Sequence, residues 1–371
     1  MAKGFTMGSL PLASDGVLTD KCGLVKHALQ ICLIALTCLL ARTGKAAETP
    51  LTNIVFGSCL NKTAHPMLDR TLTLPMDLFI FMGDNIYGDT TNMTVMRAKY
   101  DALRQSTFMQ GLKKKAPCIA TWDDHDFGMN DGGADFPAKK EAQQEFYNWL
   151  DEPLDSPRRK QEGVYDARIY GPKGQRVQII LLDTRYFRSK LTRGNHGMEP
   201  SGGPYIPSPF KSTTMLGEAQ WSWLEKKLKE PAEVRLIISS IQFVPEFAGC
   251  ESWANLPHEK VRMLELLKTT KANGVVFLSG DRHWCEFSKM DGLAGYPIYE
   301  LTASAMTQRH PRGTPTPNIY RHTPKTYHEA NVGTLRLEWA GKETNLHLGI
   351  VDAEGQTQLD YTIPLTELQP K

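Results

Sequence analysis

Five apolar runs of strand length in this chain are each followed directly by residues of the kinds that bind metals or phosphate. The runs lie at 54–56, 78–82, 119–121, 179–182 and 277–278. The residues that follow them are Gly57-Ser58-Cys59, Gly83-Asp84-Asn85-Ile86-Tyr87, Trp122-Asp123-Asp124-His125-Asp126, Asp183-Thr184-Arg185 and Ser279-Gly280-Asp281-Arg282-His283. Converging strand ends would place these side chains around one cavity, where α/β folds hold ligands. The pattern predicts an α/β fold with one polar site at a sheet edge.

The segment after the second run pairs a carboxylate, Asp84, with a phenol, Tyr87. Gly83 and Gly88 permit the turn that would bring both to one point. A carboxylate and a phenol together suit a hard cation such as ferric iron. Taken alone, Asp84 serves equally well as a helix cap with Tyr87 packed on it. The other four strand ends favour metal binding, and two cations that share one carboxylate would account for so many ligand-type residues.

The rest of the chain continues the alternation of strands and helices. Further apolar runs lie at 236–241 and 298–301, and amphipathic helices are predicted at Ala142–Leu150, Gly217–Lys229 and Val261–Leu267. Long loops are predicted near 188–209 and 310–324. Alternating residues at 335–339, 346–351 and 358–363, with a turn at 352–355, predict an antiparallel C-terminal hairpin. Since no linker divides the chain, we expect one α/β domain with a mixed sheet core.

The N-terminal region has the layout of a secretory signal peptide. Its apolar stretch 28–41 is too short to span a bilayer comfortably, basic Lys21 and Lys26 precede it, and Gly44-Lys45-Ala46 offers a small-x-small site. We therefore expect a signal peptide at 1–46, cleavage near Ala46, and a domain at 47–371 that is secreted or periplasmic. The alternative is an uncleaved N-terminal membrane anchor. Any membrane contact is expected through this leader alone.

The five strand-end motifs occur in the order seen in one family. Gly-Ser-Cys, Gly-Asp-x-x-Tyr, Trp-Asp-Asp-His-Asp, Asp-Thr-Arg and Ser-Gly-Asp-x-His resemble the motifs of alkaline phosphatase D, the PhoD-type branch of the calcineurin-like metallophosphoesterases. The resemblance implies two mixed β-sheets packed as a sandwich flanked by helices, a four-layer αββα arrangement. Because the first motif follows soon after the predicted cleavage site, the chain resembles a short form without an N-terminal accessory domain.

The resemblance also implies a ligand set. Ferric iron would be held by four residues, Cys59, Asp84, Tyr87 and His283. The Asp84 carboxylate would bridge to a second divalent cation, which is calcium in the best-known type, with Zn²⁺ or Mn²⁺ as alternatives. This second ion would also be held by Asp124, Asn130 and Asp281. The chain departs from the family at Met129 and at Asp126, which replaces a glutamate, so the role of Asp126 stays open.

The chemistry expected of such a site is phosphoester hydrolysis by a metal-bound hydroxide. His125 is placed to stabilise the transition state or to protonate the leaving alkoxide; a metal-binding or merely packed imidazole is the alternative. Arg185 and Arg282 would each hold a phosphate oxygen. For Arg185, a structural ion pair with Asp183 or another acid is an equal alternative.

These expectations define three hypotheses about function. The first is a secreted metal-dependent phosphoesterase acting on small phosphomonoesters or phosphodiesters. The second is a phospholipase D-like or nuclease-type phosphodiesterase, which the net charge of only +2 argues against for polyanionic substrates. No nucleic-acid partner is therefore expected. The third is a catalytically silent metal-binding protein, which the intact ligand set argues against. Oligomeric state is not indicated.

Overall fold

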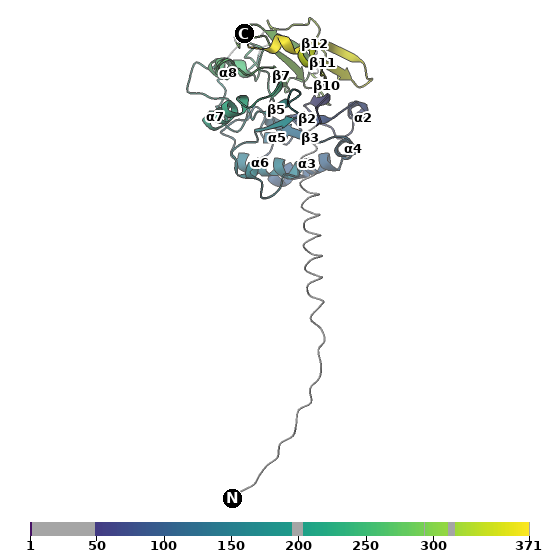
Figure 1. Ribbon diagram of the computed structural model, residues 1–371. Coiled ribbons are helices and arrows are strands. Elements are labelled where there is room, and N and C mark those ends of the chain that lie inside the picture. The colour runs from purple at the N-terminus through teal and green to yellow at the C-terminus, as the bar shows by residue number, and fades with distance from the viewer. Residues whose placement is uncertain (2–48, 195–202, 293, 311–315, 371) are drawn as a thin grey trace, which may run out of the picture. The chain divides into compact units, whose positions relative to one another are not determined.

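The computed structural model describes residues 1, 49–194, 203–292, 294–310 and 316–370, and its contacts divide the chain into units 1–48 and 49–371 (Figure 1). The predicted signal peptide lies outside the described residues. Within the described part of the chain, no helix is long and apolar enough to cross a membrane.

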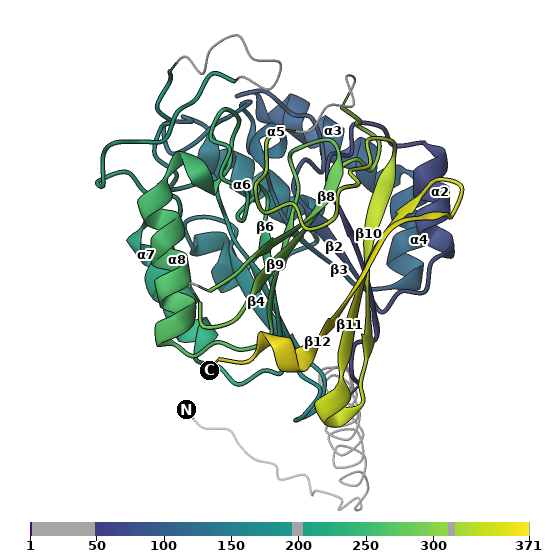
Figure 2. The ribbon, with the colours of Figure 1, turned by 90° about the horizontal axis from the view of Figure 1, so that it is seen from above.

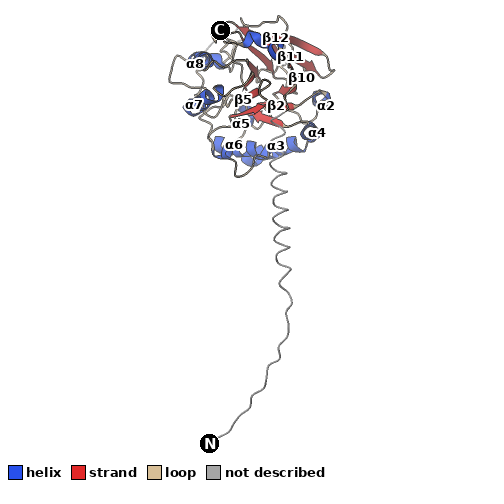
Figure 3. Ribbon diagram, viewed as in Figure 1, coloured by secondary structure: helices blue, strands red, loops and turns tan. Residues whose placement is uncertain are grey.

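Two six-stranded mixed sheets form the centre of the second unit (Figure 3). The first has the strand order β12-β11-β10-β1-β2-β3, with bounds β1 Asn53–Gly57, β2 Leu78–Met82, β3 Cys118–Thr121, β10 Asn331–Glu338, β11 Asn345–Asp352 and β12 Thr357–Pro364. The second has the order β4-β5-β6-β7-β9-β8, with bounds β4 Asp166–Tyr170, β5 Val177–Leu181, β6 Val234–Ser239, β7 Val275–Ser279, β8 Cys285–Met290 and β9 Ile298–Ala303. Strands β1, β2 and β3 run parallel, as do β5, β6, β7 and β9.

Alternating residues of the first sheet enter two different cores. Ile54 and Ile80 belong to a core shared with the second sheet, whereas Val55, Phe79 and Phe81 belong to a core shared with helices. This division follows from the two-residue period of a strand, which sends successive side chains to opposite faces. The sequences of the central strands are therefore continuously apolar, because both faces of these strands are buried.

Helices cover the outer faces of both sheets (Figure 2). Helices α7 (Gly217–Leu228) and α8 (Pro257–Thr269) flank the second sheet, and their residues Trp221, Leu224 and Met263 belong to the same apolar cluster as the strands of that sheet. The first sheet is covered by residues of α2 (Pro66–Thr73), α3 (Met93–Gln105), α4 (Thr107–Lys115), α5 (Asp124–Phe127) and α6 (Lys139–Trp149). The resulting helix–sheet–sheet–helix order confirms the predicted α/β sandwich.

The strand predictions hold best where the sequence is continuously apolar. β2 and β7 lie where the apolar runs predicted them, and the C-terminal alternation forms β10, β11 and β12 as antiparallel neighbours. β4 and β8 have no such signal, because β4 is an edge strand with exposed positions and β8 carries Glu286 and Lys289. Helices α2 to α5 were also not predicted from the sequence.

Candidate metal centre

The loops that follow the parallel strands of both sheets converge on one cluster of side chains. Cys59 follows β1, Asp84 follows β2, and Asp124 opens α5 directly after β3. From the second sheet, Asp281 and His283 follow β7. Both sheets thus contribute to the cluster, and their strand ends converge as the sequence pattern predicts.

Four of the predicted metal ligands lie within contact of one another. The Cys59 Sγ and Asp84 Oδ2 atoms are 3.5 Å apart, and the Tyr87 hydroxyl lies 3.3 Å from the same Asp84 oxygen. The Tyr87 hydroxyl is also 3.2 Å from Nε2 of His283. One donor atom each of Cys59, Asp84 and His283 lies within 4.8 Å of the others. Thiol, carboxylate, phenol and imidazole therefore surround one point.

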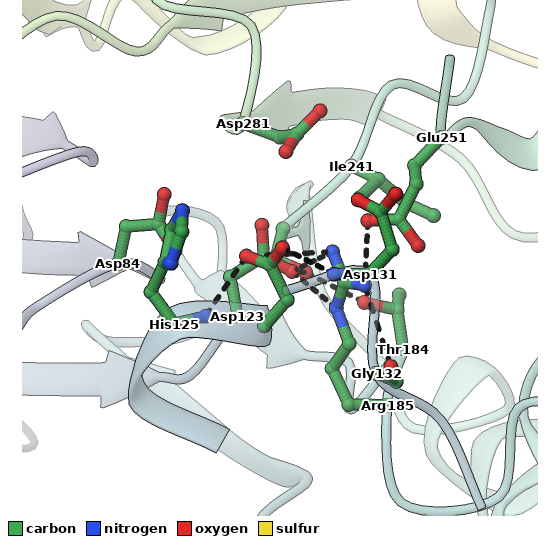
Figure 4. Close-up of polar contacts among 12 residues, drawn as sticks. Asp84, Asp123, His125, Asp131, Gly132, Thr184, Arg185, Ile241, Glu251 and Asp281 are labelled. Atoms are coloured by element: carbon green, nitrogen blue, oxygen red, sulfur yellow. Dashed lines mark hydrogen bonds and ion pairs between the residues drawn. The ribbon is translucent and has the colours of Figure 1, made fainter. Parts of the chain in front are cut away.

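Asp84 and Asp124 connect this group to further carboxylates. Donor atoms of Asp84, Asp124 and His125 lie within 4.8 Å of one another, and so do those of Asp123, Asp124 and Asp281. Asp84 thus belongs to two adjacent groups, which is the arrangement required of a carboxylate that bridges two ions. Figure 4 shows Asp281 above the strand-end residues Asp84, Asp123 and His125.

The backbone at the cluster is held in an unusual conformation. Six of the eight non-glycine residues with positive φ in the described chain belong to the cluster or contact it: Cys59, Asp84, Asp89, Asp131, Asp281 and His283. Such conformations persist only where the surrounding structure imposes them, and they concentrate at functional sites. Only glycine fits at position 83 (φ +106°), because a Cβ atom there would lie 2.5 Å from Cβ of Asp123.

Asp126 has a structural role beneath the cluster. Its Oδ1 accepts the Asp123 backbone N–H at 2.6 Å, which caps α5, and its Oδ2 accepts from the side-chain amide of Asn85 at 2.5 Å. It thereby joins the loop after β2, which carries Asp84, to the loop after β3, which carries Asp124.

Arg185 is fully buried and forms close ion pairs with two acids and a longer one, of 4.0 Å, with Asp124 (Figure 4). Its Nε donates to Asp123 Oδ1 at 2.5 Å, and its Nη1 lies 2.6 Å from Glu251 Oε2. Asp183 accepts the backbone N–H of Arg185 rather than its guanidinium. The geometry therefore favours the structural ion pair over the phosphate contact that the sequence left as an equal alternative, with Asp123 and Glu251 as the partners.

The turn after α5 brings Asp131 to the cluster. Its backbone N–H donates to Asp124 Oδ2 at 2.8 Å, and its carboxylate accepts from the Tyr205 hydroxyl at 2.5 Å. Asn130, the predicted ligand, is exposed beside it. Asp124, Asp131 and Glu251 also place donor atoms within 4.8 Å of one another, but Glu251 already pairs with both Arg185 and Arg188.

His125 lies between the metal-binding groups and Asp89. Its Nδ1–H donates to Asp89 Oδ1 at 2.8 Å, and its ring packs on Tyr87 with centroids 4.1 Å apart. Burial lowers the pKa of His125, but the hydrogen bond to Asp89 and the negative charges of Asp124, Asp89 and Asp123 together raise it to about 9. His125 is therefore protonated at neutral pH and able to donate a proton.

The donor set fits cations on physical grounds. Burial, and then the neighbouring carboxylate of Asp124, raise the pKa of Asp84 well above its usual value, and burial does the same for the Cys59 thiol and the Tyr87 phenol. Burial also lowers the pKa of His283 to about 4, which leaves a neutral imidazole suited to a metal. Asp84 Oδ1 and Asp123 Oδ2 are buried without a hydrogen-bond partner among the described residues. Crowded anionic ligands with unpaired oxygens are stable when cations lie between them.

Sequence reasoning missed Asp89, Asp131, Glu251 and Tyr205 at this site. Asp89 closes the same Gly-Asp motif that contains Asp84 and Tyr87, and Asp131 follows Asn130, so a wider window around each motif would have included both. Glu251 and Tyr205 lie outside every strand-end motif. No local signal in the sequence marks them.

The fold and the site together define an α/β sandwich protein with a candidate metal centre at its strand ends. The profile of the PhoD-like phosphatase family matches residues 58–357, so the chain belongs to that family. It is 23% identical over 281 residues to alkaline phosphatase D of Bacillus subtilis (strain 168), a match that covers 64% of this chain and 46% of that protein. The chain therefore spans about half the length of this curated relative.

Solved structures agree with the fold. A structure of PhoD matches with a TM-score of 0.62 at 18% identity, over 86% of this chain and 73% of that one. A dimetal phosphatase from Danio rerio matches with a TM-score of 0.51 at 14% identity, over 85% and 99% of the two chains. GAP50 of Plasmodium, described as an anchor in the inner membrane complex, matches with a TM-score of 0.53 at 13% identity, over 86% and 89%.

Proposed function

We propose that this protein is a metal-dependent phosphoric ester hydrolase acting on small phosphomonoesters or phosphodiesters. The observation that carries the proposal is the convergence of Cys59, Asp84, Tyr87 and His283, whose donor atoms are 3.2–3.5 Å apart in successive pairs. Because the fold also occurs in a protein described as an anchor, the residues of the site rather than the fold support catalysis.

In this proposal, Cys59, Asp84, Tyr87 and His283 would hold ferric iron. Asp84 would also serve a second divalent cation, together with Asp124 and Asp281; calcium is the first choice for that ion because its ligands would be oxygens. Asn130 stays a predicted ligand of the same ion. When bound, the two cations supply Lewis acidity that lowers the pKa of water and neutralises phosphoryl oxygens.

The chain's own residues supply the proton and hold the ligands in place. His125, protonated through its contact with Asp89, donates a proton to the departing alkoxide oxygen. Arg185 holds Asp123 at the start of α5 and so fixes the loop that carries Asp124. Arg282 binds substrate beside Asp281. We further propose that residues 1–46 are a cleaved signal peptide and that the domain acts outside the cytoplasm.

An assay of p-nitrophenyl phosphate and bis-p-nitrophenyl phosphate, with and without chelator, tests the proposal. Hydrolysis of either ester that chelator abolishes and added metal restores is the expected result. Absence of turnover by protein that elemental analysis shows to be loaded with metal contradicts catalysis and favours the silent metal-binding alternative. Sequencing the N-terminus of the secreted protein tests the predicted cleavage.

A further inference from the structure

A cavity of about 230 Å³ lies directly beside the candidate metal centre. Its lining includes Tyr205, Cys250, Asp281, Arg282, His283 and Trp284. Asp281 and His283 are proposed metal ligands, so a phosphoester held at the metals has this cavity as the neighbouring space. Asp84 and Tyr87 do not belong to the lining. The cavity therefore extends away from the point where the ligands converge.

Arg282 places a poorly neutralised positive charge in the cavity wall. Its side chain is only 10% exposed, and its guanidinium lies over the Trp284 ring at 4.6 Å. Cys250 and Glu286 also favour the charged form of Arg282, but among the described residues Asp281, at 3.5 Å, is the only carboxylate within 4.0 Å of its guanidinium, whereas the buried Arg185 and Arg188 each reach a Glu251 oxygen at 2.6 Å. Asp281 moreover belongs to the carboxylate group that we assign to a cation. The Arg282 charge thus lacks a dedicated partner.

Two buried donors in this wall lack acceptors. Nε of Arg282 and Nε1 of Trp284 have no hydrogen-bond partner within the described chain. Buried N–H groups nearly always find an acceptor, and leaving a charged donor without one is especially costly. A cation stacked on an aromatic ring, with unused N–H groups and a cavity beside it, is suited to bind a carboxylate or phosphate group.

We propose that this cavity is a subsite for the leaving group and that it selects phosphoesters whose esterified alcohol carries a second anionic group, a carboxylate or a phosphate. The inference rests on the proposed hydrolase function and adds the substrate class. The cations that Asp84 and Asp124 would hold would neutralise the reacting phosphate. The Arg282 guanidinium binds the second anionic group. Tyr205 and Trp284 provide apolar walls for the part of the substrate that connects this group to the reacting phosphate.

The test compares two substrates of similar size, 3-carboxyphenyl phosphate and 3-carbamoylphenyl phosphate. Only the first carries the second anion. We expect the metal-loaded enzyme to favour it by about tenfold or more in kcat/KM, as a charged hydrogen bond in a buried site should give. In Arg282→Gln this preference falls to about one, and in Arg282→Lys it is intermediate. Arg336→Gln, which removes an exposed arginine on β10, is the matched control and should retain the preference.

Two results overturn the inference while leaving the hydrolase function intact: equal kcat/KM for both substrates in the unmodified enzyme, or a preference that Arg282→Gln retains. If neither substrate is hydrolysed, the proposed hydrolase function is contradicted, and the subsite is then tested by a binding experiment that needs no turnover.

This binding experiment uses Cys250, which lines the same cavity and is a partly exposed free cysteine. 3-Carboxyphenylphosphonate should protect Cys250 from alkylation by iodoacetamide, measured by mass spectrometry, better than the carbamoyl analogue does. Equal protection by both overturns the subsite.

Discussion

The Asp89 carboxylate accepts the Nδ1–H of His125 at 2.8 Å and holds this imidazole against the face of Tyr87. The pair lies at the rim of the candidate metal centre, since the His125 side chain is 17% exposed and that of Asp89 41%. A carboxylate that supports a protonated imidazole produces a proton donor rather than a base at neutral pH. The contact therefore has a measurable consequence for the pH dependence of the reaction.

Replacing Asp89 by asparagine should move that pH dependence. Although burial lowers it, the pKa of His125 is raised to about 9 by the Asp89 hydrogen bond together with the charges of Asp124, Asp89 and Asp123, so protonated His125, and activity that needs it, is lost as pH rises through about 9. Without the carboxylate, the alkaline limb of the kcat profile should move down by about one unit or more. The exposed Asp155→Asn is the control. An unmoved limb would exclude His125 as the titrating acid.

Replacing His125 by glutamine should matter most for poor leaving groups. Loss of a general acid costs about 10²–10⁴-fold when the departing alkoxide needs a proton. p-Nitrophenolate is a stable anion and needs little help, so its ester should lose much less. Measuring kcat for an alkyl phosphate and for p-nitrophenyl phosphate separates the two cases. Equal losses on both would instead indicate that His125 holds the metal or the phosphate.

Arg185 should prove necessary for stability. Arg185→Met leaves the carboxylates of Asp123 and Glu251 buried without their common partner, so the free energy of unfolding should fall by about 3–5 kcal/mol. Arg336→Met breaks an exposed ion pair with Glu338 and should cost at most about 1 kcal/mol. Urea unfolding of both variants gives the comparison. If Arg185→Met instead leaves the free energy of unfolding unchanged and raises KM, Arg185 binds the substrate phosphate rather than stabilising the fold.

Much of this site was predictable because it lies at strand ends. Runs such as 78–82 are fully buried, so their apolar signal is continuous and their ends are sharply defined. The residue after such a strand must emerge at the sheet edge. Cys59, Asp84 and His283 come together for that reason, from both sheets.

The contacts that sequence reasoning missed depend on loops. Glu251 is placed by ion pairs to Arg185 and Arg188, which are remote from it in sequence. Asp131, rather than Asn130, contacts Asp124 because the turn after α5 takes a positive φ of 54° at Asp131. Such a turn alters which side chain faces inward, and no periodic pattern encodes it.

Chelation should destabilise the protein in a pH-dependent manner. In the chain without cations, burial raises the pKa of Asp123 and of Asp281 to about 7 each. The folded state then binds more protons than the unfolded state between about pH 4 and pH 7, so apo-protein stability falls as pH rises through that window. Metal-loaded protein should not show this fall. Thermal unfolding at pH 5 and pH 8, before and after chelation, measures the difference, and parallel curves for both forms would argue against cations at these carboxylates.

Tyr87→Phe should change the colour of the protein. The Tyr87 hydroxyl lies between Asp84 and His283, so a phenolate there would bind iron together with both and give a visible charge-transfer band. The variant should lose or shift this band while retaining its fold, whereas Tyr170→Phe, on the edge strand β4, should leave it unchanged. Absorption spectra combined with elemental analysis provide the readout. The phenylalanine ring keeps the packing against His125. Loss of the band with an unchanged circular dichroism spectrum would therefore show that the band depends on the Tyr87 oxygen. A colourless, active enzyme containing zinc alone would refute iron at this position and leave hydrolysis as proposed.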